Sequence, residues 1–344
     1  MVPGNDARNG LQNMKWDVSE IICCGSTAEL ADRGVRDAVF AIGTFDGLHR
    51  GHLAVICTML EESRRLNATP AVLTFHPHPR AVLTPDNPPQ LLMSRARKLG
   101  ILASLGVRAV VTLPFTAEFA ALSPEDFLAR CLLSGPVRVR GVCVGSRWRF
   151  GARGAGDVAF LKKRADELGF TCLGVPETRD GDEIVSSTGI RAALAAGDVE
   201  YAARCLGRRP AVFGVVVGGY GIAGGTLHCA TANLDVRGGM LPANGVYAAF
   251  AVVGEERFPA VVNIGVAPTF DSHGNGGLVR VEAHLLVEGS PDLYGREMAL
   301  GFAARIRDEQ KFGSPEELAA RIPEDIRLAR AALEKQAQTS DQEG

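Results

Sequence analysis

The sequence lacks any long hydrophobic run: no stretch approaches the roughly 18 consecutive apolar residues of a membrane-spanning helix. The N-terminus lacks the basic segment followed by an apolar one that is typical of a secretion signal. The formal net charge is only -2, so a general attraction to nucleic acid or anionic membranes is not expected. We therefore expect a cytoplasmic protein, a monomer or weak homo-oligomer, with neither nucleic-acid nor membrane partners.

Cysteines are few and scattered: the chain has eight, and only Cys23 and Cys24 are adjacent. Their spacing does not match that of a zinc site. A chain of 344 residues does not need disulfides to fold, so we expect reduced thiols, as in a cytosol. The same length exceeds one ordinary hydrophobic core and predicts two domains, while 46% hydrophobic and 22% charged residues are typical of a globular protein.

The most informative stretch, Phe40–His52, reads F-A-I-G-T-F-D-G-L-H-R-G-H. An apolar run that ends at Ile42 predicts a strand, the glycines after it predict a turn, and apolar spacing beyond His52 predicts a helix. Unpaired N–H groups at a helix N-terminus bind anions, and glycines let a phosphate come close. If the first helical turn reaches back far enough, His49 and His52 lie on one face. We interpret the stretch as a nucleotide-phosphate site rather than a zinc site or an ordinary turn.

Strand and helix patterns alternate up to about residue 206, which predicts a doubly wound parallel sheet. Beyond the strand that ends at Ile42, strands are expected at 71–75, 109–113, 137–144 and 171–175. Helices are expected at 53–66, 95–105, 158–169 and 198–206, with one that opens within 185–191 and runs to about 196, and a further helix start at Ser123.

Three further segments are candidate phosphate sites. His76–Arg80 follows the 71–75 strand, at the edge where open sheets bind ligands, and is either a site or a solvated loop. Gly145–Asp157 is rich in glycine and arginine, which fits phosphate binding or a solvated face. Val185–Arg191 opens a helix whose hydroxyls either cap it or hold a triphosphate. Beside the Phe40–His52 stretch, we favour phosphate for this last segment.

After the linker Gly207–Pro210 the pattern changes to β segments separated by turn residues, which predicts a small antiparallel barrel. In the segment Leu278–Val287, Glu282 alternates with apolar neighbours and should point away from the more apolar face. It is then either an ordinary solvent-side residue or a catalytic one. The other expected segments are 212–217, 231–234, 245–250 and 259–264, followed by a helix pair or one interrupted helix at 315–333.

Both ends of the chain are polar, and the two expected domains lie between them. Residues 1–13 should be disordered, 14–206 and 207–334 should form the two domains, and 335–344 should form a disordered tail. Met14 as the true start is a hypothesis that N-terminal sequencing of native protein would test.

A series of ordered motifs from about Met14 to Arg330 makes the chain resemble the bifunctional riboflavin kinase/FAD synthetases of bacteria. In the first half these are G-T-F-D-G-L-H-R-G-H (Gly43–His52), T-F-H-P-H-P (Thr74–Pro79), L-P-F-T-A-E-F-A-A-L-S-P-E-D-F (Leu113–Phe127) and S-S-T-G-I-R (Ser186–Arg191). In the second half they are T-A-N-L (Thr231–Leu234), G-V-Y-A (Gly245–Ala248), N-I-G-V-A-P-T-F (Asn263–Phe270), D-L-Y-G (Asp292–Gly295) and I-R-D-E-Q-K-F (Ile306–Phe312).

The resemblance implies that residues 14–206 form a Rossmann-like nucleotidylyltransferase domain that adenylates FMN. FMN phosphate would attack the α-phosphorus of ATP, and pyrophosphate would leave to give FAD, with Mg²⁺ as cofactor and no covalent enzyme intermediate. It implies that His49 and His52 hold phosphates in the transition state and that Ser187, Thr188 and Arg191 steady the pyrophosphate. The resemblance also assigns Gly43, Phe45, Asp46 and Gly51 to the ATP/phosphate site.

For residues 207–334, the resemblance implies a riboflavin kinase built on a small antiparallel barrel with a terminal helix. Thr231 and Asn233 would bind Mg²⁺ and ATP, because hard oxygen ligands suit Mg²⁺. Glu282 would be the general base that takes the proton from the ribityl hydroxyl. Gly218, Gly225 and Arg307 would complete the ATP/flavin site.

Two loops depart from the family pattern. Arg147 stands where members usually have Asp or Asn, and Arg cannot replace an acidic or amide acceptor. Gly218–Gly225 carries no basic residue, and His228 and Ala230 replace a Gly and a Pro. Two alternatives therefore stay open: a monofunctional FMN adenylyltransferase with a degenerate kinase module, and a non-catalytic flavin-binding protein. A nucleotidylyltransferase for another substrate would fit the first domain alone, but the β module argues against it.

Overall fold

The computed structural model describes residues 21–218, 231–266, 279–287, 292–310 and 312–342. The expectations for residues 1–13 and for Met14 lie outside these ranges. Contacts divide the chain into two compact units: a sheet unit that extends to Ser186, and a barrel unit that comprises Leu91–Ser94 and the chain from Ser187 onward. The two helices expected to close the first domain thus group with the barrel unit. The boundary between residues 206 and 207 stays a prediction.

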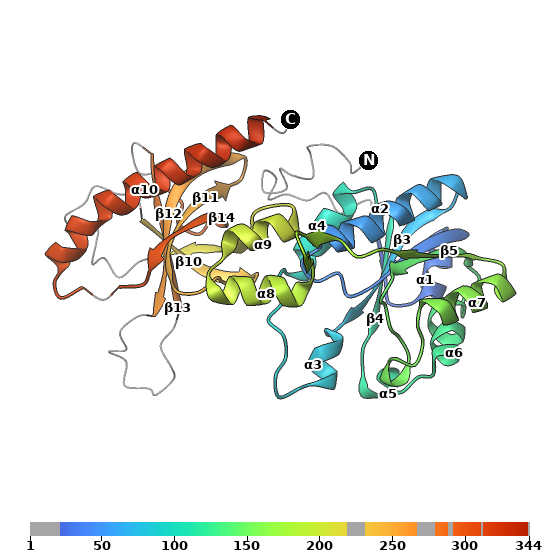
Figure 1. The fold of residues 1–344 in the computed structure, drawn as a ribbon. Coiled ribbons are helices and arrows are strands. Elements are labelled where there is room, and N and C mark those ends of the chain that lie inside the picture. The colour runs from blue at the N-terminus through green and yellow to red at the C-terminus, as the bar shows by residue number, and fades with distance from the viewer. Residues whose placement is uncertain (1–20, 219–230, 267–278, 288–291, 311, 343–344) are drawn as a thin grey trace. The chain divides into compact units, whose positions relative to one another are not determined.

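Six parallel strands form the sheet of the sheet unit, in the order β1-β4-β3-β2-β5-β6 (Figure 1). The expected parallel sheet is therefore confirmed. The strands are β1 Ile22–Cys24, β2 Asp37–Ile42, β3 Thr69–His76, β4 Ala109–Pro114, β5 Arg138–Gly145 and β6 Thr171–Val175, and β7 Arg179–Asp180 pairs with β8 Glu183–Ile184 as a separate hairpin. The helical segments are α1 Thr27–Asp32, α2 Arg50–Arg65, α3 Pro79–Leu83, α4 Arg95–Ser104, α5 Ala117–Ala120, α6 Pro124–Phe127, η2 Leu128–Leu132, η3 Ala152–Gly154 and α7 Val158–Leu168.

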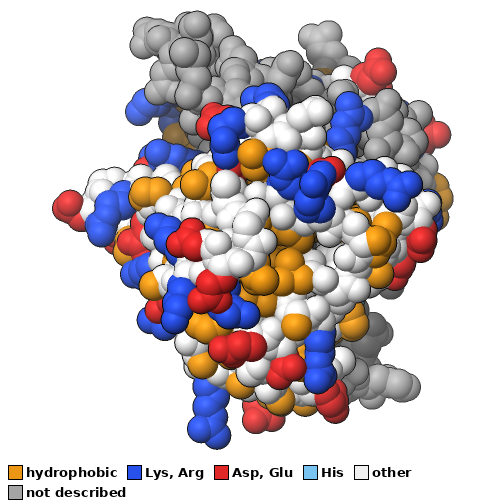
Figure 2. All heavy atoms as spheres, turned by 90° about the vertical axis from the view of Figure 1, so that its right-hand side faces the viewer, with side chains coloured by type: hydrophobic (Ala, Val, Ile, Leu, Met, Phe, Trp, Pro, Cys, Tyr) orange, Lys and Arg blue, Asp and Glu red, His pale blue; other side chains and the backbone are white. Residues whose placement is uncertain are grey.

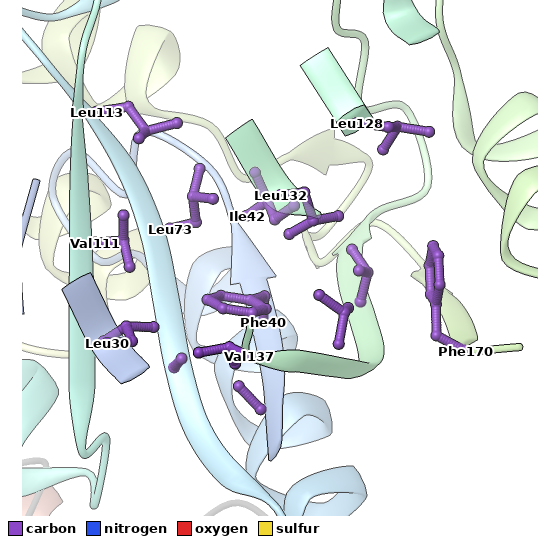
Figure 3. Packing of buried hydrophobic residues seen from close by; sticks show 14 of the residues in the cluster. Leu30, Phe40, Ile42, Leu73, Val111, Leu113, Leu128, Leu132, Val137 and Phe170 are labelled. Atoms are coloured by element: carbon purple, nitrogen blue, oxygen red, sulfur yellow. The ribbon is translucent and has the colours of Figure 1, made fainter. Parts of the chain in front are cut away.

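The core of the sheet unit lies against both faces of β2. Phe40 and Ile42 point to one face, where they pack in a cluster with Leu73 and Leu132 (Figure 3). Val39 and Ala41, which point to the opposite face, are fully buried as well, so both faces of the strand are covered. Burying an aliphatic or aromatic side chain of this size stabilises the fold by about 1.5–3 kcal/mol. The unbroken apolar run of β2 therefore matches a strand that is covered on both sides.

Two helix starts show how proline acts in this chain. Ser123 caps α6 as expected: its Oγ accepts the N–H of Asp126 at 3.0 Å, and Pro124 opens the helix. The prolines of His76–Arg80 predict a loop without regular structure, and this expectation is wrong from Pro79 onward, because α3 begins there with His78 as its N-cap. A proline that cannot continue a strand still suits the first turn of a helix.

The barrel unit is built around a closed antiparallel barrel with strand order β10-β13-β12-β11-β14-β9 (Figure 1). The predicted small antiparallel barrel is thus confirmed. Its elements are α8 Ser187–Ala196, α9 Val199–Leu206, β9 Ala211–Val217, β10 Thr231–Gly238, β11 Gly245–Val253, β12 Glu256–Val266, β13 Val279–Leu285, β14 Glu297–Asp308 and α10 Pro315–Gln342.

Two elements at the end of the chain differ from expectation. Strand β14 was not predicted, because Met298–Ala303 is buried on both faces and therefore shows no alternation. The terminal segment forms one helix, α10, with Pro323 inside it, and this helix continues past Lys335, where a disordered tail was expected. Ala329 and Leu333 of α10 pack on the barrel strands β11 and β14, so tertiary packing holds the helix together.

The surface matches the small net charge of the chain. Lys and Arg side chains are interspersed with Asp and Glu on the face seen in Figure 2. Among the described residues, no helix combines the length and the apolar character needed to cross a membrane. Seven of the eight cysteines lie in the described part of the chain, and each is a free thiol. Burial raises the pKa of the Cys143 thiol to about 12.

Two candidate active sites

The turn Gly43–His49, called the phosphate turn here, joins β2 to α2 as the sequence predicted. The Gly43 N–H donates to the Leu73 carbonyl at 3.1 Å, which fixes the turn to the end of β3. Phe45, Gly47 and Leu48 then adopt left-handed backbone conformations, with φ of 50°, 84° and 41°. Two of these are non-glycine residues, so the turn is strained and must be held by its surroundings.

His49 and His52 lie together at the N-terminus of α2. His49 is the N-cap, and its Nδ1 accepts the N–H of His52 at 3.3 Å. The two imidazole rings stack with centroids 3.6 Å apart and an interplanar angle of 18°. Phe45 packs edge-on against the His52 ring at 5.3 Å. The helix therefore reaches back far enough to place both histidines on one face, beside backbone N–H groups that suit an anion.

Two glycines are required where the chain approaches these rings. A Cβ on Gly43 would lie 3.2 Å from the Phe45 ring, and a Cβ on Gly51 would lie 3.2 Å from the His49 ring. A side chain at either position would push the ring or the turn aside. The glycines thus keep the N-terminus of α2 open, as phosphate binding needs.

Aromatic side chains gather at the carboxyl ends of β3, β4 and β5. Phe75 packs edge-on against Phe115, with ring centroids 5.9 Å apart. Trp148 and Phe150 stack at 4.5 Å, and both contact Phe127. The sequence reading did not single out this cluster. Aromatics directly after successive strands are the signal that could have found it, because those ends meet at one edge of a parallel sheet.

Arg147, the residue that departs from the family pattern, forms an ion pair across the same edge. Its Nε lies 2.6 Å from Glu177 Oε1, just beyond the end of β6. The neighbouring Arg149 lies 3.5 Å from Asp157. Arg147 and Arg149 of the 145–157 loop are therefore paired with acidic side chains of the sheet unit.

The segment with Ser187, Thr188 and Arg191 begins α8, as expected, within the barrel unit. Ile190 and Leu194 are buried in that unit. At the other end of α8, the Arg305 guanidinium donates to the carbonyl oxygens of Ala196 and Asn244, each at 3.0 Å. Barrel residues thus fix the orientation of α8, the helix that carries Ser187, Thr188 and Arg191.

In the barrel, Glu282 lies between two carboxamide side chains. Its position on β13 is directly opposite Asn233 on β10 and opposite Asn263 on β12. Residues directly opposite in antiparallel strands project to the same face, with Cβ atoms roughly 4.5–5.5 Å apart. Val281 and Ala283 are buried, which confirms that Glu282 points away from the apolar face. Asn263 was part of a quoted motif but had no assigned role; only strand register reveals it.

The structure describes the other expected kinase residues only in part. Thr231 lies opposite His284, and burial lowers the pKa of His284. The Thr231 side chain lies outside the described part of the structure, and so do Gly225 and the departures His228 and Ala230. Gly218 directly follows β9, and a Cβ on it would lie 3.6 Å from the Tyr294 ring.

Arg307 has a structural partner. Its guanidinium donates to both carboxylate oxygens of Asp325 on α10, at 2.8 to 3.1 Å. The two side chains are only 12% and 6% exposed. The pair fixes α10 to β14, and the ligand role expected for Arg307 stays a prediction.

Models of two protein families match the chain: FAD synthetase over residues 32–189, and riboflavin kinase over residues 206–333. Together with the two folds, these matches define a protein that joins an FAD synthetase module to a flavokinase barrel. The chain belongs to the family of bifunctional riboflavin kinase/FMN adenylyltransferases.

Relatives of that name match most of the chain. The protein of Escherichia coli (strain K12) is 38% identical over 293 residues, which covers 85% of this chain and 91% of the relative. That of Pseudomonas fluorescens is 36% identical and covers 86% and 93%. That of Bacillus subtilis (strain 168) is 33% identical and covers 84% and 90%. A crystal structure described as a macrolide-efflux protein from Streptococcus pneumoniae is similar in fold, with a TM-score of 0.78 and 26% identity over 90% of this chain and 99% of that one.

Proposed function

We propose that the chain carries out both reactions of its family, with separate residues for each. The barrel unit phosphorylates riboflavin to FMN, and the phosphate turn of the sheet unit serves the adenylation of FMN to FAD. The observation that carries this proposal is that each unit holds its own polar cluster: stacked His49 and His52 in one, and Glu282 between Asn233 and Asn263 in the other. The family assignment favours this function over a monofunctional enzyme or a non-catalytic flavin-binding protein.

Adenylyl transfer at the phosphate turn is positioning plus charge neutralisation. A phosphate oxygen of FMN attacks the α-phosphorus of ATP, a new P–O bond forms, and the bond to the β-phosphate bridging oxygen breaks, so pyrophosphate leaves. His49 and His52 donate hydrogen bonds to phosphate oxygens, and the turn at Gly43, Phe45, Asp46 and Gly51 holds ATP against the helix N-terminus. Ser187, Thr188 and Arg191 stay predicted pyrophosphate contacts, since hydroxyl groups and an arginine fork match phosphate geometry.

Aromatic side chains at the carboxyl ends of β3, β4 and β5 are the residues we propose to contact a flat apolar ring. Phe75 packs against Phe115, and Trp148 stacks on Phe150. Ring stacking favours an isoalloxazine over a small sugar phosphate as the second substrate.

Phosphoryl transfer in the barrel uses Glu282 as general base. Its carboxylate takes the proton from the terminal ribityl hydroxyl while that oxygen attacks the γ-phosphorus of ATP, and ADP leaves. Flanking carboxamides of Asn233 and Asn263 can donate to Glu282 and keep it in place, because they project from the same face.

Oxygen donors in the barrel fit Mg²⁺. Asn233 supplies a hard oxygen ligand, and Thr231 lies on the same strand as Asn233. Thr231 and Asn233 would hold the ion, which neutralises charge on the ATP phosphates when bound. Chelation of the metal should therefore stop the kinase reaction.

We also propose that the protein acts in the cytoplasm on riboflavin, FMN and ATP, as a monomer or weak homo-oligomer, without nucleic-acid or membrane partners. Size-exclusion chromatography with light scattering and cell fractionation test these points.

A product assay tests the proposed function. Purified protein is incubated with ATP, Mg²⁺ and either riboflavin or FMN, and flavins are separated by chromatography. FMN and then FAD should form from riboflavin, and FAD should form from FMN. FAD from FMN with none from riboflavin would overturn the kinase, and no FAD from FMN would overturn the adenylyltransferase.

A further inference from the structure

Lys98 on α4 contacts the phosphate turn from a distant part of the sequence. Its Nζ donates a hydrogen bond to the Thr44 carbonyl oxygen at 2.7 Å. Thr74 of β3 donates its hydroxyl to the same oxygen at 3.2 Å. Two donors from separate elements thus converge on one carbonyl within the turn, and neither has a part in the chemistry derived above.

The Lys98 ammonium is removed from water, and its burial costs free energy. Burial lowers the pKa of Lys98, and the charge of nearby Asp46 acts in the opposite direction. Asp46 itself is only 2% exposed. A cation removed from water destabilises the fold unless hydrogen bonds and an opposite charge compensate, and Thr44 and Asp46 supply both.

The contact acts where the turn is strained. Phe45 and Leu48 hold left-handed conformations that non-glycine residues adopt only when their surroundings enforce them. A trans peptide is planar, so its C=O and N–H point in opposite directions. With the Thr44 carbonyl held by Lys98, the N–H of Phe45 is aimed the other way. Lys98 therefore fixes the orientation of a backbone donor in the turn.

We propose that Lys98 is a positioning residue for adenylyl transfer: its ammonium fixes the Thr44–Phe45 peptide and with it the phosphate turn that receives ATP. This inference rests on the proposed phosphate role of the turn. Lys98 acts through the backbone and not on substrate, and Thr74 supports the same carbonyl with a weaker, uncharged hydrogen bond.

The test compares Lys98→Met with Lys163→Met, a matched removal of an exposed lysine on α7 of the same unit. Loss of a hydrogen bond from a charged donor predicts that the KM for ATP in adenylyl transfer rises about tenfold or more in Lys98→Met. Riboflavin kinase activity of the same molecules should be unchanged, and Lys163→Met should behave as wild type. Thr74→Val should raise the same KM by less. Lys98→Arg, which keeps a charged donor, should recover part of the loss.

Three results would each overturn a different part of the proposal. A fall in kcat in proportion to the folded fraction, with an unchanged KM for ATP, would make Lys98 merely structural and overturn the proposal. Unchanged kinetics in Lys98→Met, with activity lost in His49→Asn, would overturn the role of Lys98 and leave the phosphate turn intact. Unchanged kinetics in both variants would overturn the proposed role of the turn itself.

Discussion

The His49 ring stacks on the His52 ring with centroids 3.6 Å apart, while His49 Nδ1 caps the helix by accepting the N–H of His52. Capping and phosphate binding can therefore be separated by substitution. His49→Asn keeps a side-chain acceptor at the N-cap, and His49→Ala removes it, at about 0.5–2 kcal/mol of stability.

Both His49 variants should lose adenylyl transfer, with kcat lower by about 10²–10³, because both remove the imidazole whose N–H donates to the transition state, and the shorter Asn carboxamide does not place a donor at the same point. Thermal unfolding should show a destabilised His49→Ala and a nearly unchanged His49→Asn, and the kinase reaction should persist in both. Wild-type kcat for FAD formation in His49→Asn would contradict a direct role for the imidazole.

Glu282 should be required only for the kinase. Glu282→Gln keeps the size of the side chain and removes the base, so the rate of FMN formation should fall by about 10²–10⁴. FAD formation from supplied FMN should be unchanged, and Glu334→Gln, a matched change at an exposed residue of α10, should have no effect on either rate. A kinase rate in Glu282→Gln within a few-fold of wild type would exclude the proposed base.

The buried pair of Arg307 and Asp325 should matter for stability. Asp325→Ala leaves the guanidinium, only 12% exposed, without its carboxylate and should cost about 3–5 kcal/mol. The pair of Arg327 and Glu324 on the same helix is exposed, so Arg327→Ala should cost less than about 1 kcal/mol. Denaturant unfolding compares the two, and equal losses would refute the structural role of the buried pair.

A double variant separates this structural role from the predicted ligand role of Arg307. Replacing both partners with apolar residues of similar size, as in Arg307→Met with Asp325→Leu, should restore most of the stability. The KM values of the kinase in that variant then report on ligand contact alone. An increase supports Arg307 as an ATP or flavin contact, and unchanged values would limit it to the ion pair.

Glu62 should make the sheet unit sensitive to acid. The side-chain hydrogen bond from Arg65, and a further one from Thr171, lower the pKa of this carboxyl group, whose side chain is 8% exposed. Because its pKa is lower in the folded state, Glu62 stabilises the fold above its unfolded pKa, and this contribution is lost as pH falls through the folded pKa. Glu62→Gln should therefore be less stable at pH 7, and its stability should change less between pH 5 and pH 3 than that of wild type.

Urea unfolding at several pH values measures this effect. Arg164→Gln offers a control, since it removes an ion pair between Arg164 and Glu167 that lies on the partly exposed side of α7. Parallel pH profiles for Glu62→Gln and wild type would contradict the assigned linkage.

The spacing of apolar residues predicted the helices and strands that have one buried face or that border a glycine or proline turn. The strand at Phe40, the glycine turn and the helix that His49 caps all followed from spacing, because each depends on neighbours within a few residues. Strand β14 did not, since Met298–Ala303 is buried on both faces and, unlike the run that ends at Ile42, is not followed by a glycine turn.

Contacts between distant residues could not be read from the sequence. Lys98 reaches the Thr44 carbonyl from another helix, and Asn263 meets Glu282 only through strand register. Arg147 pairs with Glu177 because β5 and β6 are neighbours in the sheet. Motifs identified which residues matter, whereas topology decided which of them lie together.

Complementation of two variants tests most directly that one chain holds two separate sites. His49→Asn and Glu282→Gln are each given riboflavin, ATP and Mg²⁺, alone and mixed, and the FAD formed is measured by chromatography. Alone, the first should stop at FMN and the second should form neither flavin product; mixed, they should make FAD, because FMN released by one is adenylated by the other. A mixture that makes no FAD, or FAD from either variant alone at the wild-type rate, would contradict the account.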